Sequence, residues 1–507
     1  MQNLARRAGQ GTMILATAWL LFQLALAAWL FARHDWAVVT FPYPVDYGEG
    51  PLLDQALRLA RLENIYRTSL DAPPYTISNY PPLFPLLQVP FAAALGPALW
   101  YGRAIAALSM LAAALFVALS LHTLTKDLVA SAAGGLLVLA FPYTLHWSAF
   151  NRVDSLALGL SCAALFAVAR WPHRRAGLVT TALLLTAAIF TRQSYALAAP
   201  LAAFVWLLRE PPRRRAFALV ALTGGACLAL LLALQLATGG GFFFNVVTAN
   251  VNPFVWANLR YRLEELRDHL LPLLAAAGLF ALLGAWYAGR HALGPGGWRS
   301  SPTPRAAGAP PAWWLVAPYL VGAALSALTI GKTGSNVNYL FELCAALSLA
   351  AGALLAWAGR RPWLRAALAL GLALQVGAMA AWSRADYAPR ALGKVAQRAE
   401  IERLLAVVEG AGGPVLADEY MGLIPLAGQR LYFQPFELKQ LAEAGVWDER
   451  PFTRQLDARE FPAILIYDPP DWNSFDERWT GRQQLYILTG YAPAERYADT
   501  IVYRPAR

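Results

Sequence analysis

Long apolar segments recur along most of this chain and alternate with short polar loops. A helix needs about 20 mainly apolar residues to cross the hydrocarbon core of a bilayer. Segments near that length fall at 13–32, 103–121, 128–145, 155–169, 177–190, 195–208, 216–237, 270–287, 313–330, 339–357 and 364–382. The pattern predicts a polytopic α-helical membrane protein with about eleven transmembrane helices.

The first large loop, residues 33–100, has a pattern of its own. Apolar residues at helical spacing over 52–62, with charged residues on another face, predict an amphipathic helix at the membrane interface. Residues 71–85 are rich in Pro and Tyr, which predicts an extended and rigid segment. The apolar run 83–95 is too short to span a bilayer, so we expect it to re-enter the membrane or lie along its surface.

The pattern changes after the last predicted span. From about residue 385 charged residues become frequent and apolar runs shorten to the length of strands. Helices are predicted at 396–408 and 436–444, and short buried strands at 414–418 and 463–467. The chain therefore divides into a transmembrane domain, residues 1–384, which includes the outside loop 33–100, and a small soluble α/β domain, residues 385–507.

Composition and charge fit this class. Of 507 residues, 58% are hydrophobic and 14% charged, which excludes a soluble globular protein. The net charge of +11 would suit nucleic acid, but the arginines are spread over short loops, so we expect no nucleic-acid partner. Every second loop is basic, which predicts the N-terminus inside and the C-terminal domain outside. The Gly-, Pro- and Ser-rich segment 294–311 is predicted to be a flexible inside loop.

Polar and charged residues gather in the loops that this topology places outside. They are Asp46, Tyr47, Glu49, Asn79 and Tyr80 in the first loop, Arg152 and Asp154 in the next, Arg192 and Gln193 between two close spans, and Lys332, Asn336, Asn338 and Glu342 further along. Independent membrane crossings would not place all of these residues on one face by chance. We therefore predict a single site at the outer membrane surface.

The two acids of the first loop are candidates for proton transfer. Asp46 and Glu49 are three residues apart, and the glycines beside them allow a close backbone approach. Such a pair can supply a general base and a hydrogen-bond acceptor for a sugar. The alternative is an acidic turn in which one of the two side chains caps a helix.

The later outside loops supply cations. Arg152 can bind a phosphate through two hydrogen bonds while Asp154 holds it in place, although a purely structural Arg–Asp pair explains the same residues. Arg192 is expected near the outer interface, where an arginine can also simply extend toward water. Lys332 adds a cation for which functional and structural roles are equally open. Glu342 lies inside an apolar run, where a carboxylate needs a partner or a function.

Motifs of several enzyme classes are absent from the sequence. No Walker-type glycine loop, dinucleotide fingerprint, His-Glu-x-x-His or Gly-x-Ser-x-Gly is present, which argues against a nucleotide-driven or zinc enzyme. What remains is a site of carboxylates and cations, suited to a phosphate leaving group that a lipid delivers. No cofactor is required, and a divalent cation beside Asp46 and Glu49 is compatible with these residues.

The outside motifs resemble those of bacterial GT-C fold glycosyltransferases. The resemblance rests on Asp46-Tyr47-Gly48-Glu49-Gly50, Tyr80-Pro81-Pro82-Leu83, Arg152-x-Asp154 and Thr191-Arg192-Gln193, and it covers about the first 380 residues in topology. It is closest to glycosyltransferase family 39, which includes protein O-mannosyltransferases and the aminoarabinose transferases of lipid A. The adjacent Asp-Glu pair usual in that family is replaced here by two acids separated by Tyr47 and Gly48.

The resemblance implies transfer of a sugar from a polyprenyl-phosphate donor to a hydroxyl of a lipid, glycan or protein acceptor, at the outer face of the bacterial cytoplasmic membrane. An acid of the first outside loop acts as base in such enzymes, a role that maps onto Asp46, or onto Glu49 if the alignment shifts. Inverting transfer is expected, with Arg152, Arg192 and Lys332 binding the donor phosphate and Glu49 orienting a substrate. Substrate-binding roles are expected for Tyr47, Asn79, Tyr80, Asp154, Gln193, Asn336, Asn338 and Glu342.

Two other classes are compatible with many spans and buried charges. A transporter or flippase would place charges near the middle of the membrane and often contains repeated halves. A scaffold or assembly subunit would use the C-terminal domain for binding. The gathering of charges at one interface, without a visible repeat, favours the enzyme.

Overall fold

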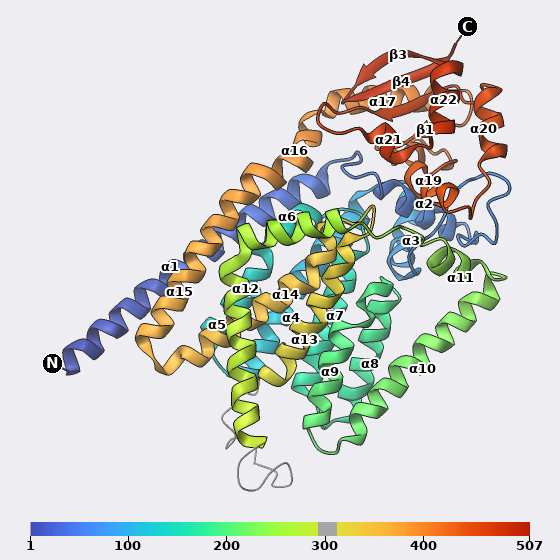
Figure 1. The fold of residues 1–507 in the computed structure, drawn as a ribbon. Helices are drawn as coiled ribbons and strands as arrows, with labels where there is room; N and C mark the ends of the chain where they lie inside the picture. Colours follow the sequence, from blue (N-terminus) through green and yellow to red (C-terminus); the bar gives the residue numbers. More distant parts are fainter. Residues whose placement is uncertain (1, 293–311, 507) are drawn as a thin grey trace.

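The computed structural model of the protein describes residues 2–292 and 312–506, so the predicted inside loop 294–311 lies outside the described residues. A helical bundle forms the larger part, and a small α/β domain covers one end of it (Figure 1). The chain begins at the side opposite that domain, at the far end of α1 (Gln2–Thr40). The fold class predicted from the hydrophobic pattern is confirmed.

Each of the predicted spans falls on a helix. They are α1, α4 (Trp100–Thr125), α5 (Leu128–Ala140), α7 (Asp154–Arg170), α8 (Arg175–Ile189), α9 (Ala198–Arg209), α10 (Arg214–Ala237), α12 (Trp256–Ala292), α13 (Trp313–Ala327), α14 (Phe341–Trp357) and α15 (Pro362–Trp382). In the described part of the chain, seven helices are long and apolar enough to cross a membrane, which indicates a multi-pass membrane protein. The helices α5, α7, α8 and α9 have only 12 to 17 residues, so a total of eleven crossings stays a prediction.

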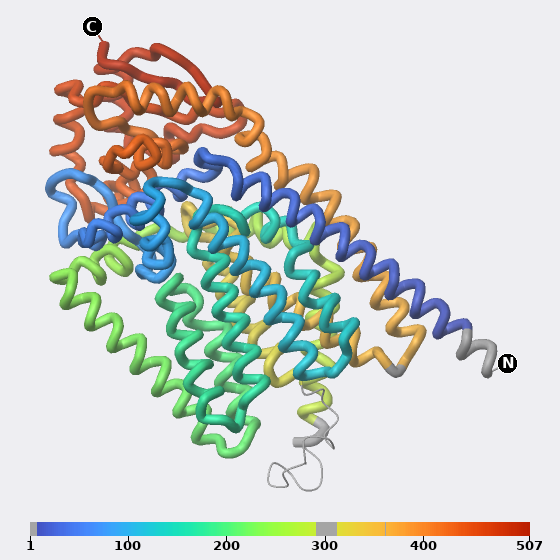
Figure 2. The backbone as a smooth tube through the Cα atoms, turned by 180° about the vertical axis from the view of Figure 1, so that it is seen from behind, coloured from blue at the N-terminus to red at the C-terminus, as the bar shows by residue number. Residues whose placement is uncertain are grey.

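The outer surface of the bundle is apolar, as contact with lipid requires. α10 runs obliquely along one edge (Figure 2) and buries little more than Ala216, Leu219 and Thr223. Its large side chains face outward, with Phe217 61% and Leu228 57% exposed. α14 is the opposite case, because almost all of its residues are buried among the other helices.

The predicted outside loop, residues 33–100, forms two helices, one of which packs against the C-terminal domain. α2 (Glu49–Ala60) is amphipathic as predicted, but both of its faces are covered, one by α3 (Leu83–Leu95) and another by α18 (Leu423–Leu426). A Cβ at Gly50 would overlap the backbone of Gly422, so glycine is needed where the two domains meet. The expected interfacial helix is therefore a layer between bundle and C-terminal domain.

The C-terminal domain is built on a mixed four-stranded sheet. Its strands are β1 (Leu416–Ala417), β2 (Ile464–Tyr467), β3 (Tyr491–Tyr497) and β4 (Thr500–Pro505), in the order β1-β2-β4-β3. β1 and β2 are parallel, and the other pairs are antiparallel. The helices around it are α17 (Arg398–Glu409), α18, α19 (Pro435–Glu443), α20 (Arg450–Asp457), α21 (Ser474–Arg478) and α22 (Gly481–Gly490). The helical rod of α15 continues through a π-helical turn into α16 (Ala388–Ala396), so the compact part of the domain begins at α17.

The first outside loop also contributes to the core of the C-terminal domain. The amide of Tyr75 donates to the Tyr432 carbonyl at 2.7 Å, and the amide of Gln434 donates to the Tyr75 carbonyl at 3.1 Å. The Tyr75 ring packs edge-on against Phe452 and contacts Trp447. Because this loop leaves the bundle and enters the other domain's core, it fixes how the two domains sit relative to one another.

Candidate active site

A polar cavity of about 310 Å³ lies where the bundle, the first outside loop and the C-terminal domain meet. Nine of the predicted site residues line it: Tyr47, Asn79, Tyr80, Arg152, Arg192, Gln193, Lys332, Asn336 and Asn338. Four predicted residues do not line it: Asp46, Glu49, Asp154 and Glu342. The structure thus brings together loops that are almost 300 residues apart in the sequence.

Asp46 stands behind Arg152 and holds it in place. Arg152 Nε lies 2.6 Å from Asp46 Oδ1, and the guanidinium lies over the rings of Tyr47 and Trp147, 5.0 and 5.3 Å from their centroids. A Cβ at Gly48 would overlap the guanidinium, which explains the glycine of the Asp46-Tyr47-Gly48 motif. Burial raises the pKa of Asp46, and the attraction of Arg152 opposes that rise only in part.

Asp154 holds Arg192 in the same manner. Arg192 pairs with Asp154 Oδ1, while Trp147 Nε1 donates to Asp154 Oδ2 at 3.0 Å. The Arg192 guanidinium lies 4.2 Å from the centroid of the Tyr339 ring. Each arginine therefore has a carboxylate behind it and an aromatic ring beside it, which restricts its movement. Lys332 differs, because none of the described carboxylates lies within ion-pair distance of it.

Glu49 has a different environment from Asp46. It is fully buried and pairs with Arg103, whose Nε and Nη2 each lie 2.7 Å from a carboxylate oxygen. The amides of Val45 and Asn151 donate to it at 2.9 and 2.8 Å. Burial alone would raise the pKa of Glu49, but Arg103 outweighs it and lowers that pKa. This geometry suits a structural anchor, and it gives no support to the expected catalytic role.

Arg103 completes this anchor in the first turn of α4. Besides Glu49, its guanidinium donates to the carbonyls of Val38 at 2.8 Å and Tyr43 at 2.7 Å. One buried arginine thus connects α4, the end of α1 and the first outside loop. The side chains of Asp46 and Tyr47 project from a loop that is fixed on both sides.

Glu342 lies in α14, away from the cavity. It is 4% exposed, and the contact found for it is a long hydrogen bond of 3.4 Å from Ser161 Oγ. The sequence placed it at an outside boundary because it follows Asn336 and Asn338 closely. The helix begins at Phe341 and carries Glu342 into the bundle, so its substrate-binding role stays a prediction.

The C-terminal domain contributes lining residues that sequence analysis did not predict. They are Gln434, Phe436 and Glu437, at the start of α19. Other lining polar residues that were not predicted are Gln55, Ser194, Asn250, Asn252, Thr329, Thr333 and Tyr339. No local motif marks Glu437, because only the docking of the C-terminal domain brings it to the cavity.

Three buried acceptor atoms of lining residues have no hydrogen-bond partner in the described part of the chain. They are Gln193 Oε1, Asn338 Oδ1 and Glu437 Oε2. Buried polar atoms in native proteins are almost always hydrogen-bonded, so acceptors without partners at a cavity indicate a ligand that donates. The cavity therefore combines three cations with several acceptors, the complement of a molecule with an anionic group and hydroxyls.

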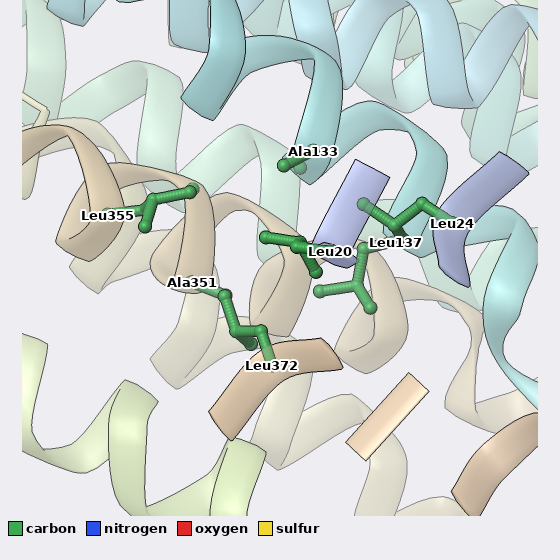
Figure 3. Close-up of a pocket in the computed structure, with 9 residues that line it drawn as sticks. Leu20, Leu24, Ala133, Leu137, Ala351, Leu355 and Leu372 are labelled. Atoms are coloured by element: carbon green, nitrogen blue, oxygen red, sulfur yellow. The ribbon is translucent and has the colours of Figure 1, made fainter. Parts of the chain in front are cut away.

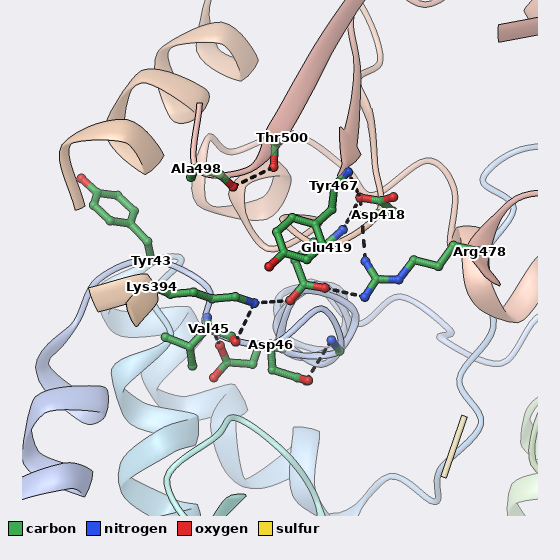
Figure 4. A network of polar contacts seen from close by, with 12 residues as sticks. Tyr43, Val45, Asp46, Lys394, Asp418, Glu419, Tyr467, Arg478, Ala498 and Thr500 are labelled. Atoms are coloured by element: carbon green, nitrogen blue, oxygen red, sulfur yellow. Dashed lines mark hydrogen bonds and ion pairs between the residues drawn. The ribbon is translucent and has the colours of Figure 1, made fainter. Parts of the chain in front are cut away.

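An ionic network docks the C-terminal domain beside this cavity (Figure 4). Lys394 and Arg478 both pair with Glu419, and Lys394 Nζ also donates to the Val45 carbonyl at 3.0 Å. Burial alone would raise the pKa of Glu419, but these two cations lower it to about 2. Its stabilising contribution is therefore present above the ordinary pKa and is lost only as the pH falls toward 2.

The same network reaches the cavity through Tyr47. Arg478 lies over the Tyr47 ring, 5.0 Å from its centroid, as does Arg152 at the same distance. The neighbouring Asp418 accepts from the amides of Glu419 and Tyr467, at 2.6 and 2.9 Å, at the end of β1. Asp418 and Glu419, which follow β1 directly, are thus part of the domain interface.

Two other features do not add a site. An apolar hollow of about 10 Å³ inside the bundle (Figure 3) is lined by Leu, Ala and Gly residues and offers no polar side chain. Within residues 2–292 and 312–506 there is also no group of three or more His, Cys, Asp or Glu that could hold a metal ion. Asp46 and Glu49 face two different arginines.

Comparison with known proteins supports the architecture. No family model matches the sequence, and no curated protein matches it. The fold is that of GT-C membrane glycosyltransferases, as the sequence motifs suggested. The structure is similar to ArnT from Cupriavidus metallidurans in the apo state, with a TM-score of 0.62 and 16% identity over 96% of this chain and 98% of that one. For the same protein bound to undecaprenyl phosphate, the TM-score is 0.60 and the identity 15%, with the same coverage.

Glu419→Gln is expected to loosen the docking of the C-terminal domain. Removing one partner of a buried ion pair leaves the remaining charges uncompensated and costs about 3 to 5 kcal/mol. Thermal unfolding of the purified protein, together with protease cleavage near residue 397, measures the effect. Glu443→Gln is the matched control, because the Glu443 side chain is 55% exposed where it pairs with Lys439, and ion pairs at the surface contribute at most about 1 kcal/mol. Equal unfolding temperatures for the two variants would contradict the assigned role of Glu419.

Proposed function

We propose that this protein transfers a sugar from a polyprenyl phosphate to an acceptor hydroxyl at the outer face of the membrane. The observation that carries the proposal is the composition of the cavity, where Arg152, Arg192 and Lys332 lie beside acceptor atoms without partners. A lipid-linked sugar phosphate supplies both an anion and hydroxyl donors. A solved protein of similar fold, ArnT from Cupriavidus metallidurans, has a structure bound to undecaprenyl phosphate, which supports the lipid part of the donor.

The cations are suited to the leaving phosphate. Asp46 and Asp154 keep the guanidinium groups of Arg152 and Arg192 in place before any ligand arrives. Groups oriented in advance stabilise developing charge without a cost of rearrangement during the reaction. Lys332 has no carboxylate partner among the described residues. Its positive charge is therefore balanced by the phosphate when the donor binds.

The proposed reaction is a single inverting displacement. The acceptor oxygen forms a bond to the anomeric carbon while the bond from that carbon to the phosphate oxygen breaks, and its electron pair leaves with the polyprenyl phosphate. Asp46 takes the acceptor's proton. Asp46 lies behind Arg152 and outside the cavity lining, and both of its described contacts use Oδ1, so we propose that the acceptor's proton goes to the free Oδ2. The pKa of Asp46, raised by burial, makes it a stronger base than an exposed carboxylate.

The location of the cavity supports an outward-facing enzyme. It lies at the end of the bundle covered by the C-terminal domain, whereas the basic loops after α7 and α9 lie at the other end (Figure 1). Positive loops are typical of the cytoplasmic side, so we propose an N-terminus inside and a C-terminal domain outside a bacterial cytoplasmic membrane. A transporter would have its site near the middle of the bundle.

Asp46→Asn is expected to reduce turnover by about a hundredfold or more, because proton transfer is lost. The assay measures release of undecaprenyl phosphate from a membrane extract of lipid-linked sugars. Asp71→Asn, an exposed change in the same loop, is the control and should leave the rate unchanged. A rate for Asp46→Asn equal to that of the control would exclude Asp46 as the base.

Lys332→Gln is expected to weaken binding of undecaprenyl phosphate about tenfold or more, since a charge-assisted hydrogen bond contributes about 1.5 to 3 kcal/mol. Native mass spectrometry of the purified protein at several lipid concentrations gives the dissociation constant. Lys126→Gln, at the opposite end of α4 from the cavity, should bind as the unchanged protein does. Unaltered affinity in Lys332→Gln would remove this lysine from the phosphate site.

A further inference from the structure

Glu437 is a carboxylate at the cavity that forms no ion pair within the described part of the chain. It lies in the first turn of α19 and lines the cavity from the C-terminal domain. Its Oε2 is buried without a hydrogen-bond partner, and none of the described cations forms an ion pair with it. Arg152 and Arg478 are near enough to act on its pKa, but burial outweighs them and raises it. A group in this situation is costly unless a ligand satisfies it.

The start of α19 holds Glu437 firmly. Gln434 Oε1 accepts from the Ile77 amide at 2.6 Å, and the Gln434 amide donates to Tyr75, so the first outside loop fixes the helix. Phe436 packs against the Tyr47 ring, 6.1 Å between centroids. The carboxylate is therefore placed in advance, as a binding group should be.

Glu437 lines the cavity together with Gln193 and Asn338 of the bundle. Among the described residues that line the cavity, Gln193 Oε1 and Asn338 Oδ1 are the other buried acceptors without a hydrogen-bond partner. A phosphate dianion has no donor for any of them, and a single acceptor hydroxyl would satisfy only one. Several hydroxyls on one ring would satisfy all three, and carboxylates and amide oxygens are ordinary acceptors for hydroxyl groups.

We propose that Glu437, with Asn338 and Gln193, binds the hydroxyls of the donor's sugar, so that the C-terminal domain forms one side of the sugar subsite. This inference rests on the proposed function and adds that the two domains bind different parts of the donor. The cations of the bundle bind the lipid phosphate, and a carboxylate of the C-terminal domain recognises the sugar that the phosphate carries.

The test compares binding of undecaprenyl phosphate with and without a sugar. The full-length protein in nanodiscs is titrated with undecaprenyl phosphate and with undecaprenyl phosphate bearing glucose, galactose, mannose or xylose. For the unchanged protein, at least one sugar should tighten binding about tenfold or more, the value of one well-formed hydrogen bond to a charged group. Glu437→Gln should lose most of that gain while its affinity for the sugar-free lipid stays within about threefold.

Control variants separate the possible causes. Glu443→Gln, on the same helix but exposed, should keep the full sugar gain. Asn338→Ala should lose part of the gain and provides the test if Glu437→Gln does not fold. An unchanged gain in Glu437→Gln, an equal loss for both kinds of lipid, or no gain with any of the four sugars in the unchanged protein would overturn the inference. Failure of the unchanged protein to bind undecaprenyl phosphate at all would overturn the proposed function itself.

Discussion

The buried ion pair between Glu49 and Arg103 is the interaction on which the rest of the structure depends. It fixes the first outside loop to α4 and, through the Arg103 contacts with backbone carbonyls, to the end of α1. The buried polar atoms of the Glu49 carboxylate and of the Arg103 guanidinium all have partners. A buried ion pair is tolerated under that condition. Asp46 and Tyr47 belong to the same loop, so fixing the loop positions them against Arg152.

The loop anchored in this way joins two domains into one site. Tyr47 lies between Arg152 of the bundle and Arg478 of the C-terminal domain, and Tyr75 of the same loop packs in the C-terminal core. The lining of the cavity therefore comes from both domains, with cations on the bundle side and Glu437 on the other. This arrangement supports the proposal that the C-terminal domain takes part in substrate binding.

Local patterns in the sequence predicted much of the fold and of the cavity lining. Membrane spans are long apolar runs, and the arginines and carboxylates at their outer ends are costly unless used, so the sequence pointed to nine of the residues that line the cavity. The role of Glu49 was not predictable, because its partner Arg103 lies 54 residues away inside a span with no distinguishing motif. Glu437 was not predictable either, since its place at the cavity depends on docking between segments almost 400 residues apart. The hairpin of β3 and β4 was missed because its residues alternate only weakly between buried and exposed positions.

The most direct test of the account is an experimental structure of the protein with undecaprenyl phosphate bound. The account predicts the phosphate inside the polar cavity, within hydrogen-bond distance of Lys332 and of at least one guanidinium held by Asp46 or Asp154. A phosphate bound at the other end of the bundle, or outside this cavity with Arg152, Arg192 and Lys332 uninvolved, would contradict it.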